Sequence, residues 1–182
     1  KIFKSLGADI LRLWVASSDF SSEMTVSDEI LKRTADSYRR MRNTVRYLLS
    51  NLDSFEPATD LVADKDLLAL DRWILHHTAQ LQEQVRAHYE AYEFHQLYQL
   101  LHKFCSTELG GLYLDIIKDR VYTTISDSLP RRSAQTAVYH ISQALLRWLA
   151  PILSFTAEEA YAQLPGERSD SVFLQHWYQA LP

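Results

Sequence analysis

The chain of 182 residues is long enough for one domain of ordinary size, and its 47% hydrophobic content can fill a substantial core. Its formal net charge of -4 excludes an indiscriminate polyanion-binding protein, so any nucleic-acid contact must use a local basic cluster. The single cysteine, Cys105, excludes an internal disulfide and a cysteine-based zinc site, and no apolar run is long enough to span a membrane.

The first third of the chain predicts two helices. A low content of 4 Gly and 5 Pro favours helices over β-structure throughout. Residues 8–18 predict a short, mostly buried helix, and Asp9 lies near its start, where a carboxylate suits the helix dipole. A polar loop at 19–24 follows, after which Ser27 offers an N-cap. We expect a long helix from there to about Leu52.

The middle of the chain predicts two further long helices. The first covers residues 65–91, and the second begins at about Glu93. The pair Gly110-Gly111 interrupts the latter at a cost in helix propensity. Because a missing side chain lets two backbones approach, we expect close contact with a neighbouring helix at that point.

The last third predicts a fourth long helix and a short one. Leu129-Pro130 begins the long helix, with proline in the first turn where it is tolerated, and Pro151 ends or kinks it. Thr156-Ala-Glu-Glu159 has the pattern of a capping box, which predicts a short helix that stops at Pro165-Gly166. The predicted fold is all-α, an antiparallel helical bundle with a short leading connecting helix.

The predicted helix after Ser27 carries a row of basic residues. Arg42 and Arg46 have no acid three or four residues away on either side, yet they lie one turn apart and are aligned with Arg39. Bound phosphates would stabilise such a stripe of like charges more than water does, since arginine can bind phosphate through two N–H groups at once. The remaining cations can form pairs within the helix, namely Asp28 with Lys32, Glu29 with Arg33, and Asp36 with Arg39 or Arg40.

A second basic cluster lies at the start of the fourth long helix. Arg131 and Arg132 stand in the first turn, where cations oppose the helix dipole. A bound phosphate would remove this conflict, because helix N-termini favour anions. Alternatively, an acid such as Asp127 or Glu108 neutralises them in the folded chain.

A third cluster lies within residues 112–123. Lys118 can pair with Asp115, whereas Arg120 has no acid at helical spacing, so both cations are candidates for RNA contact. Tyr113 and Tyr122 could stack on unpaired bases, although core packing is the commoner role of tyrosine.

The histidines and the cysteine do not form a chemical site. His88, His95 and His102 recur at seven-residue intervals, which separates neighbours by about 10 Å along a helix, too far to share one metal ion. No serine, histidine and aspartate stand at informative spacing, and no glycine-rich phosphate loop is present. We therefore expect no metal, no cofactor and no catalytic residue in this chain.

Three segments resemble the isoleucyl-tRNA synthetase family. The element Gly7-Ala-Asp-Ile-Leu-Arg12 is similar to class I synthetases for isoleucine, valine, leucine and methionine. The segments Leu112–Thr123 and Ala150–Tyr161 narrow the resemblance to the isoleucine branch of bacterial type. The similarity covers about residues 6–178, nearly the whole chain.

The resemblance implies a tRNA-binding region of a much longer enzyme. Residues 1–24 would form a connecting, stem-contact-like segment in which Asp9 and Arg12 are structural, and residues 25–182 would form the anticodon-binding bundle. The family's ATP-binding signatures are absent from the sequence, so the chain alone should be non-catalytic. The predicted tRNA-binding residues are Arg39, Arg42, Arg46, Lys118, Arg120, Arg131 and Arg132.

The same resemblance implies partners and cofactors. The expected partners are the anticodon arm of tRNA(Ile) and the catalytic domain of the same polypeptide, in a cytoplasmic monomer. The parent enzyme would use ATP with magnesium, and such enzymes often carry a cysteine-bound zinc in a C-terminal extension. Two alternatives stay open: the equivalent domain of a valyl- or leucyl-tRNA synthetase, and a helical protein-interaction module that binds through Trp14, Phe94 and Trp177.

Overall fold

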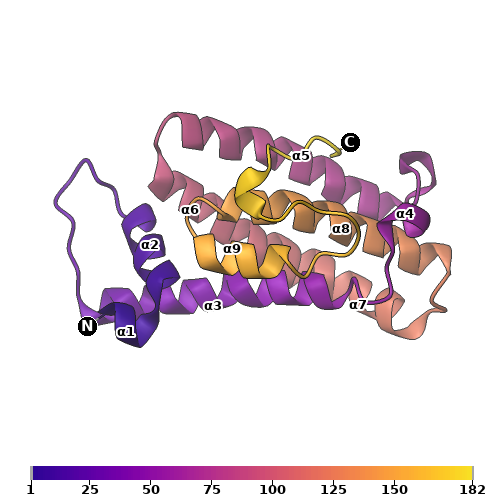
Figure 1. Cartoon of the computed structure of the whole chain (residues 1–182), viewed down its shortest axis with the longest axis horizontal. Coiled ribbons are helices and arrows are strands. Elements are labelled where there is room, and N and C mark those ends of the chain that lie inside the picture. The colour runs from indigo at the N-terminus through magenta and orange to yellow at the C-terminus, as the bar shows by residue number, and fades with distance from the viewer. Residues whose placement is uncertain (1, 182) are drawn as a thin grey trace.

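A computed structural model of the chain describes residues 2–181, with side chains described from residue 4. The long helices lie side by side in a bundle, and no strand occurs among these residues, which confirms the all-α prediction (Figure 1). The long helices are α3 (Asp28–Ser50), α5 (Ala69–Glu90), α8 (Leu129–Leu149) and a continuous rod of α6 (Phe94–Lys103), η2 (Phe104–Tyr113) and α7 (Leu114–Thr123); the short elements are α1 (Ile2–Leu6), α2 (Ala8–Ser17), α4 (Pro57–Asp60), η1 (Asp64–Asp66), α9 (Ser154–Tyr161) and η3 (Val172–Leu174).

Helix α8 forms the centre of the bundle. It packs against α3, α5, α7 and α9, and its alanines let these neighbours approach closely. Ala134, Ala137 and Ala144 are fully buried, and so is the large side chain of Trp148. Among residues 2–181, no helix is both long enough and apolar enough to cross a membrane.

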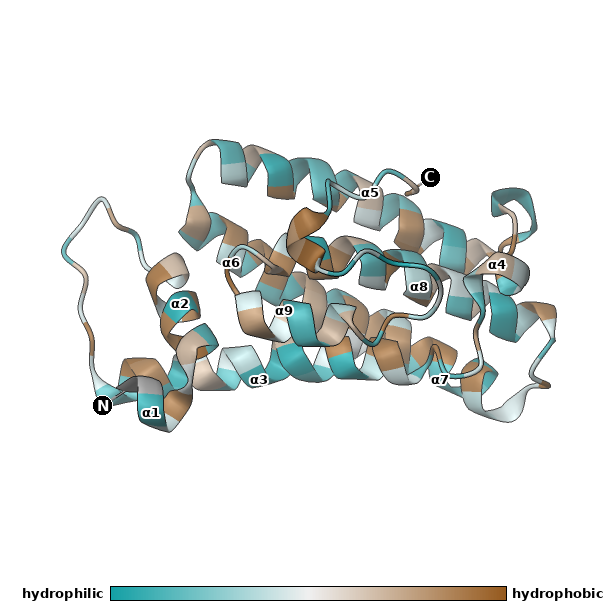
Figure 2. Cartoon of the chain, in the orientation of Figure 1, coloured by the Kyte–Doolittle hydropathy of each residue, from teal (hydrophilic) through white to brown (hydrophobic). Residues whose placement is uncertain are grey.

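Helix α3 lies along one edge of the bundle and has the predicted start. The Ser27 hydroxyl accepts a hydrogen bond from the Ile30 N–H at 3.2 Å, which satisfies a backbone donor that has no partner within the helix. Met41, Val45 and Leu48 are buried on its inner face. Hydrophilic residues occupy much of its outer face (Figure 2).

The glycine pair was predicted to interrupt the third long helix, but the chain remains helical there. Instead, the rod continues through a π-helical stretch, η2. A Cβ atom on Gly110 would lie 3.0 Å from the Cys105 carbonyl oxygen. The Thr44 hydroxyl of α3 donates a hydrogen bond to the same carbonyl at 3.0 Å. Helix α3 therefore contacts η2 at this point through Thr44, but the tightest contact of Gly110 is with the carbonyl of its own rod five residues earlier, so the predicted close approach of two helix backbones is not what the glycine permits.

The capping-box prediction at Thr156 is wrong, because a distant carboxylate caps α9. Asp9 accepts hydrogen bonds from the backbone N–H groups of Phe155 and Thr156, at 3.3 and 2.7 Å. The Thr156 hydroxyl donates to the same carboxylate at 2.6 Å. Thr156 therefore lies inside α9, and the helix ends at Tyr161 rather than at the Pro165-Gly166 pair.

The start of α5 also differs from the prediction. Residues 64–66 form a separate 3-10 turn, and the α-helix begins at Ala69. The Leu68 N–H donates a hydrogen bond to the Ser133 hydroxyl of α8 at 2.9 Å, which holds the chain in an extended conformation between the two elements.

The leading helix α2 is attached to the bundle by polar and apolar contacts. The Arg12 guanidinium donates hydrogen bonds to the carbonyls of Pro151 and Ile152, at 2.7 and 2.8 Å, so its structural role and that of Asp9 are confirmed. Leu13 is buried, but Val15 is 51% exposed. The boundary between residues 24 and 25 stays a prediction.

Candidate nucleic-acid interface

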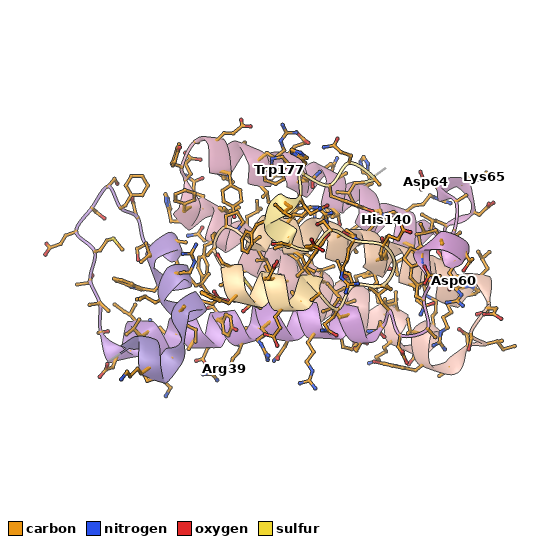
Figure 3. The ribbon with its side chains drawn as sticks, in the orientation of Figure 1. Arg39, Asp60, Asp64, Lys65, His140 and Trp177 are labelled. Atoms are coloured by element: carbon orange, nitrogen blue, oxygen red, sulfur yellow. The ribbon has the colours of Figure 1, made fainter. Side chains whose placement is uncertain are left out.

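The predicted arginine stripe lies on the exposed face of α3. The side chains of Arg42 and Arg46 are exposed, and neither forms an ion pair or hydrogen bond with any part of residues 4–181. Arg39 differs, because it pairs with Asp36 at 2.9 Å while remaining 63% exposed. Figure 3 shows Arg39 on the outer edge of α3. Two cations of the stripe are thus free to bind an anion.

The rest of α3 partly follows the predicted pairing. Arg33 pairs with Glu29 at 2.6 Å, as expected. Lys32 and Asp28 do not pair with each other within the described chain, although both lie on α3. Arg40 has no acidic partner there, because Asp36 bonds to Arg39 instead, and it lies on the side of the helix near His102. Burial lowers the pKa of His102, and the charge of Arg40 lowers it further.

A groove borders the stripe on the side of α9. It has a volume of about 710 Å³ and lies between α3, α9 and the segment that follows α3. Arg42 and Arg46 line one side, and the apolar side chains of Val45, Leu49 and Phe55 form part of its surface. The two free arginines therefore stand beside a hollow rather than on a flat surface.

A smaller groove of about 290 Å³ borders the other side of α3, towards η2 and α7. Asn43, Tyr47 and Lys118 line it, and Lys118 pairs with Asp115 at 2.8 Å. Burial and the neighbouring Tyr122 raise the pKa of Tyr47 to about 12. Sequence reasoning missed Asn43 and Tyr47, although an exposed amide next to Arg42 was a usable signal.

The two tyrosines named from the sequence take different roles. Tyr113 is fully buried and donates a hydrogen bond to Asp71 at 2.8 Å, as core packing requires. Burial and the Asp71 carboxylate raise the pKa of Tyr113 well above its usual value. Tyr122 is 64% exposed and can offer a ring face to a base.

Arg120 is engaged in a buried polar network. Its guanidinium donates two hydrogen bonds, at 3.0 and 2.9 Å, to the carboxylate of Asp71, which lies on the neighbouring helix α5. Asp71 is fully buried, and the hydroxyls of Tyr113 and Ser133 also donate to it. The network therefore joins α5, α7, α8 and η2, and it accounts for a basic residue that has no acid at helical spacing.

Arg132 is also held by acids of this chain. It pairs with Asp60 and Asp127, both at 3.1 Å, and its side chain is only 14% exposed. The Asp127 alternative is thus confirmed for Arg132, whereas Glu108 pairs with other residues. Arg131 is partly buried, has no ion pair within the described chain, and buries its Nε without a hydrogen-bond partner.

The predicted cations therefore fall into separate groups. Arg42 and Arg46 of the stripe line the larger groove on one side of α3, and Lys118 lines the smaller groove on the other side. Arg120 points instead to α5, and Arg132 lies beside Asp60, which Figure 3 shows at the far end of the bundle from α1. The described residues contain no group of three side chains that could hold a metal ion.

Comparisons with known proteins define the class. Residues 71–182 match the family described as "Anticodon-binding domain of tRNA ligase". This match covers more than half of the chain, and it agrees with the helical bundle described above. The chain belongs to the anticodon-binding domain family of tRNA ligases.

The individual relatives are isoleucine–tRNA ligases, as the resemblance predicted. The chain is 65% identical over 181 residues to that of Alkalilimnicola ehrlichii, and 62% identical over 181 residues to that of Thioalkalivibrio sulfidiphilus. It is also 62% identical over 182 residues to that of Nitrosococcus oceani. Each match covers 100% of this chain and 19% of the relative. The chain thus spans about a fifth of the length of these relatives, which favour the isoleucine branch over the valine and leucine alternatives.

Proposed function

We propose that this chain binds the anticodon arm of tRNA(Ile) and positions the tRNA for aminoacylation by a catalytic domain elsewhere in the same polypeptide. The observation that carries the proposal is the pair Arg42 and Arg46, two exposed arginines without an acidic partner in the described chain. Like charges one turn apart repel each other unless an anion binds between them. The family to which the chain belongs supplies the anion, the phosphates of tRNA.

The exposed face of α3 provides both kinds of RNA contact. Arg39, Arg42 and Arg46 are placed to hold backbone phosphates, and Lys118 can add a charge from across the smaller groove. Asn43 and the rings of Tyr47 and Tyr122 offer an amide and aromatic surfaces for unpaired bases, which is how single-stranded RNA is read.

The other predicted contacts form a weaker part of the proposal. Arg120 and Arg132 already donate to carboxylates of this chain, so they would reach tRNA only through N–H groups that those acids leave unused. Arg131 has no ion pair in the described chain and can still bind phosphate near the start of α8.

The proposal extends to the parent enzyme. It would use ATP with magnesium in its catalytic domain, and any zinc would be held by cysteines outside this chain, because Cys105 is buried and alone. The isolated chain should neither activate isoleucine nor charge tRNA. We further propose that the parent is a cytoplasmic monomer.

Footprinting of a tRNA(Ile) transcript by the 182-residue chain tests the proposal. We expect nuclease protection of the anticodon arm, and we expect Arg42→Ala/Arg46→Ala to weaken it. Arg40→Ala is the matched control, since Arg40 is an exposed arginine of α3 outside the α9 groove. Protection confined to the acceptor arm, or no protection at all, would contradict the proposal.

A further inference from the structure

The larger groove beside α3 has the size of a small-molecule site. Its volume of about 710 Å³ lies within the range of roughly 300–1,000 Å³ that is usual for ligand pockets. Val45 and Leu49 of α3 contribute apolar surface, Phe55 adds an aromatic ring, and Pro165 lies on the side of the segment after α9. The groove can therefore accept a flat, partly apolar group.

Charges of both signs line this groove without pairing to each other. Arg42 and Arg46 stand on the α3 side, Glu159 on the α9 side, and Asp53 in the segment after α3. None of these four side chains forms an ion pair or hydrogen bond within residues 4–181. Opposite charges that share a groove but stay apart suit a ligand that carries an anion at one end and N–H donors at the other.

An RNA nucleotide has this distribution of groups. Its phosphate accepts bidentate, charge-assisted hydrogen bonds from arginine. Its base can stack on an aromatic ring or on a guanidinium plane, and the base edge carries the N–H donors. Guanine presents two adjacent donors, N1–H and N2–H, to a carboxylate, whereas uracil presents a single N–H between two carbonyl acceptors.

We propose that the groove between α3 and α9 holds one unpaired nucleotide of the bound RNA, with its phosphate on Arg42 and Arg46 and the donor edge of its base on Glu159. The inference rests on the proposed tRNA binding and adds a specificity to it. Guanine is the preferred base because it presents two adjacent N–H donors to the Glu159 carboxylate, and the carboxylates of Asp53 and Glu56, which also line the groove, add to its negative potential.

Nucleotide titrations followed by amide NMR of the isotope-labelled chain test the site. Guanosine 5′-monophosphate should shift the signals of Ala160 and Gln163, which line the groove, with an affinity about tenfold above that of uridine 5′-monophosphate. Glu159→Gln should abolish this preference. Glu90→Gln should retain it, because Glu90 is an exposed glutamate of α5 away from the groove.

The arginine pair gives a separate signature. Arg42→Ala/Arg46→Ala should weaken both nucleotides by the same factor, since the phosphate is common to them. Equal affinities for the two nucleotides in the unchanged chain, or groove signals that do not move, would overturn the site.

The site and the proposed function fail in different ways. If the anticodon arm is protected by the chain but neither nucleotide moves the groove signals, the nucleotide site is wrong and tRNA binding stands. If tRNA is not bound at all, the proposed function falls, and this inference falls with it.

Discussion

Arg120 and Arg42 are both arginines on long helices, but their surroundings are opposite. Arg120 is 21% exposed and bonds through two N–H groups to the buried Asp71. Arg42 is exposed on α3 and has no partner in the described chain. The first cation compensates a charge that the fold has buried, whereas the second is available to compensate the charge of another molecule. This contrast separates cations that pair within the bundle from the cations that we propose bind RNA.

The largest effect is expected at the buried pair. Arg120→Ala should lower the free energy of unfolding by about 3–5 kcal/mol, because it leaves the Asp71 carboxylate buried without a counter-charge. Urea unfolding followed by circular dichroism measures the change. Arg42→Ala is the control and should change stability by no more than about 0.5 kcal/mol. Equal unfolding midpoints for the two variants would contradict the claim that Arg120 stabilises the fold and Arg42 does not.

Arg132 tests whether the contrast holds at a second paired cation. Arg132→Ala should cost about 1–3 kcal/mol of unfolding free energy, since it removes the partner of Asp60 and Asp127. The cost should be smaller than at Arg120, because Asp127 is 87% exposed and water can replace its lost contact. The same denaturation assay decides this, and a cost above that of Arg120→Ala would reverse the proposed ranking.

The buried thiol of Cys105 predicts that the folded chain loses stability at alkaline pH. Burial raises the pKa of the Cys105 thiol from 9.0 to about 12, so the folded chain retains a proton that the unfolded chain loses. The contribution is complete below pH 9 and decreases by about 1.4 kcal/mol per pH unit as pH rises from 9 towards 12.

Unfolding free energies measured between pH 8 and about 10 check this linkage. The Cys105→Ala variant is less stable at every pH but should show a shallower decline, since its thiol is absent. An identical decline in both proteins would assign the effect to other groups, such as the partly buried Tyr89, whose pKa is also raised by burial.

The smallest effect is expected at an exposed ion pair on the stripe itself. Arg39→Ala should change the unfolding free energy by at most about 0.5 kcal/mol, because its bond to Asp36 lies in solvent. Differential scanning calorimetry of this variant beside Asp36→Ala gives the value. A loss of several kcal/mol would place Arg39 with the structural cations.

Local sequence patterns correctly predicted the features that depend only on residues nearby in the chain. The N-cap at Ser27 and the free state of Arg42 both follow from residues within one turn. The partner of Arg120 could not be predicted, because Asp71 lies 49 residues earlier and reaches it only through the packing of two helices. The capping box at Thr156 failed for the same reason, since Asp9 caps α9 from 147 residues away.

The π-helical stretch illustrates a further limit of the sequence. Gly110-Gly111 indicated a disturbance of the helix but not its form, a π-helical stretch in which the Cys105 carbonyl accepts a hydrogen bond from Thr44 of α3. Helix propensity measures the local cost of glycine and carries no information about that bond.

The salt dependence of tRNA(Ile) binding tests the central claim most directly. Each phosphate contact that is lost should reduce the slope of log affinity against log salt by about one, so Arg42→Ala/Arg46→Ala should reduce it by about two. The slope should change less in Arg120→Ala, at temperatures where that variant is folded, because Asp71 already holds that guanidinium. A double variant that keeps the parental slope but unfolds several degrees lower would contradict the account, because Arg42 and Arg46 would then belong to the bundle's own stability and not to an RNA-binding surface.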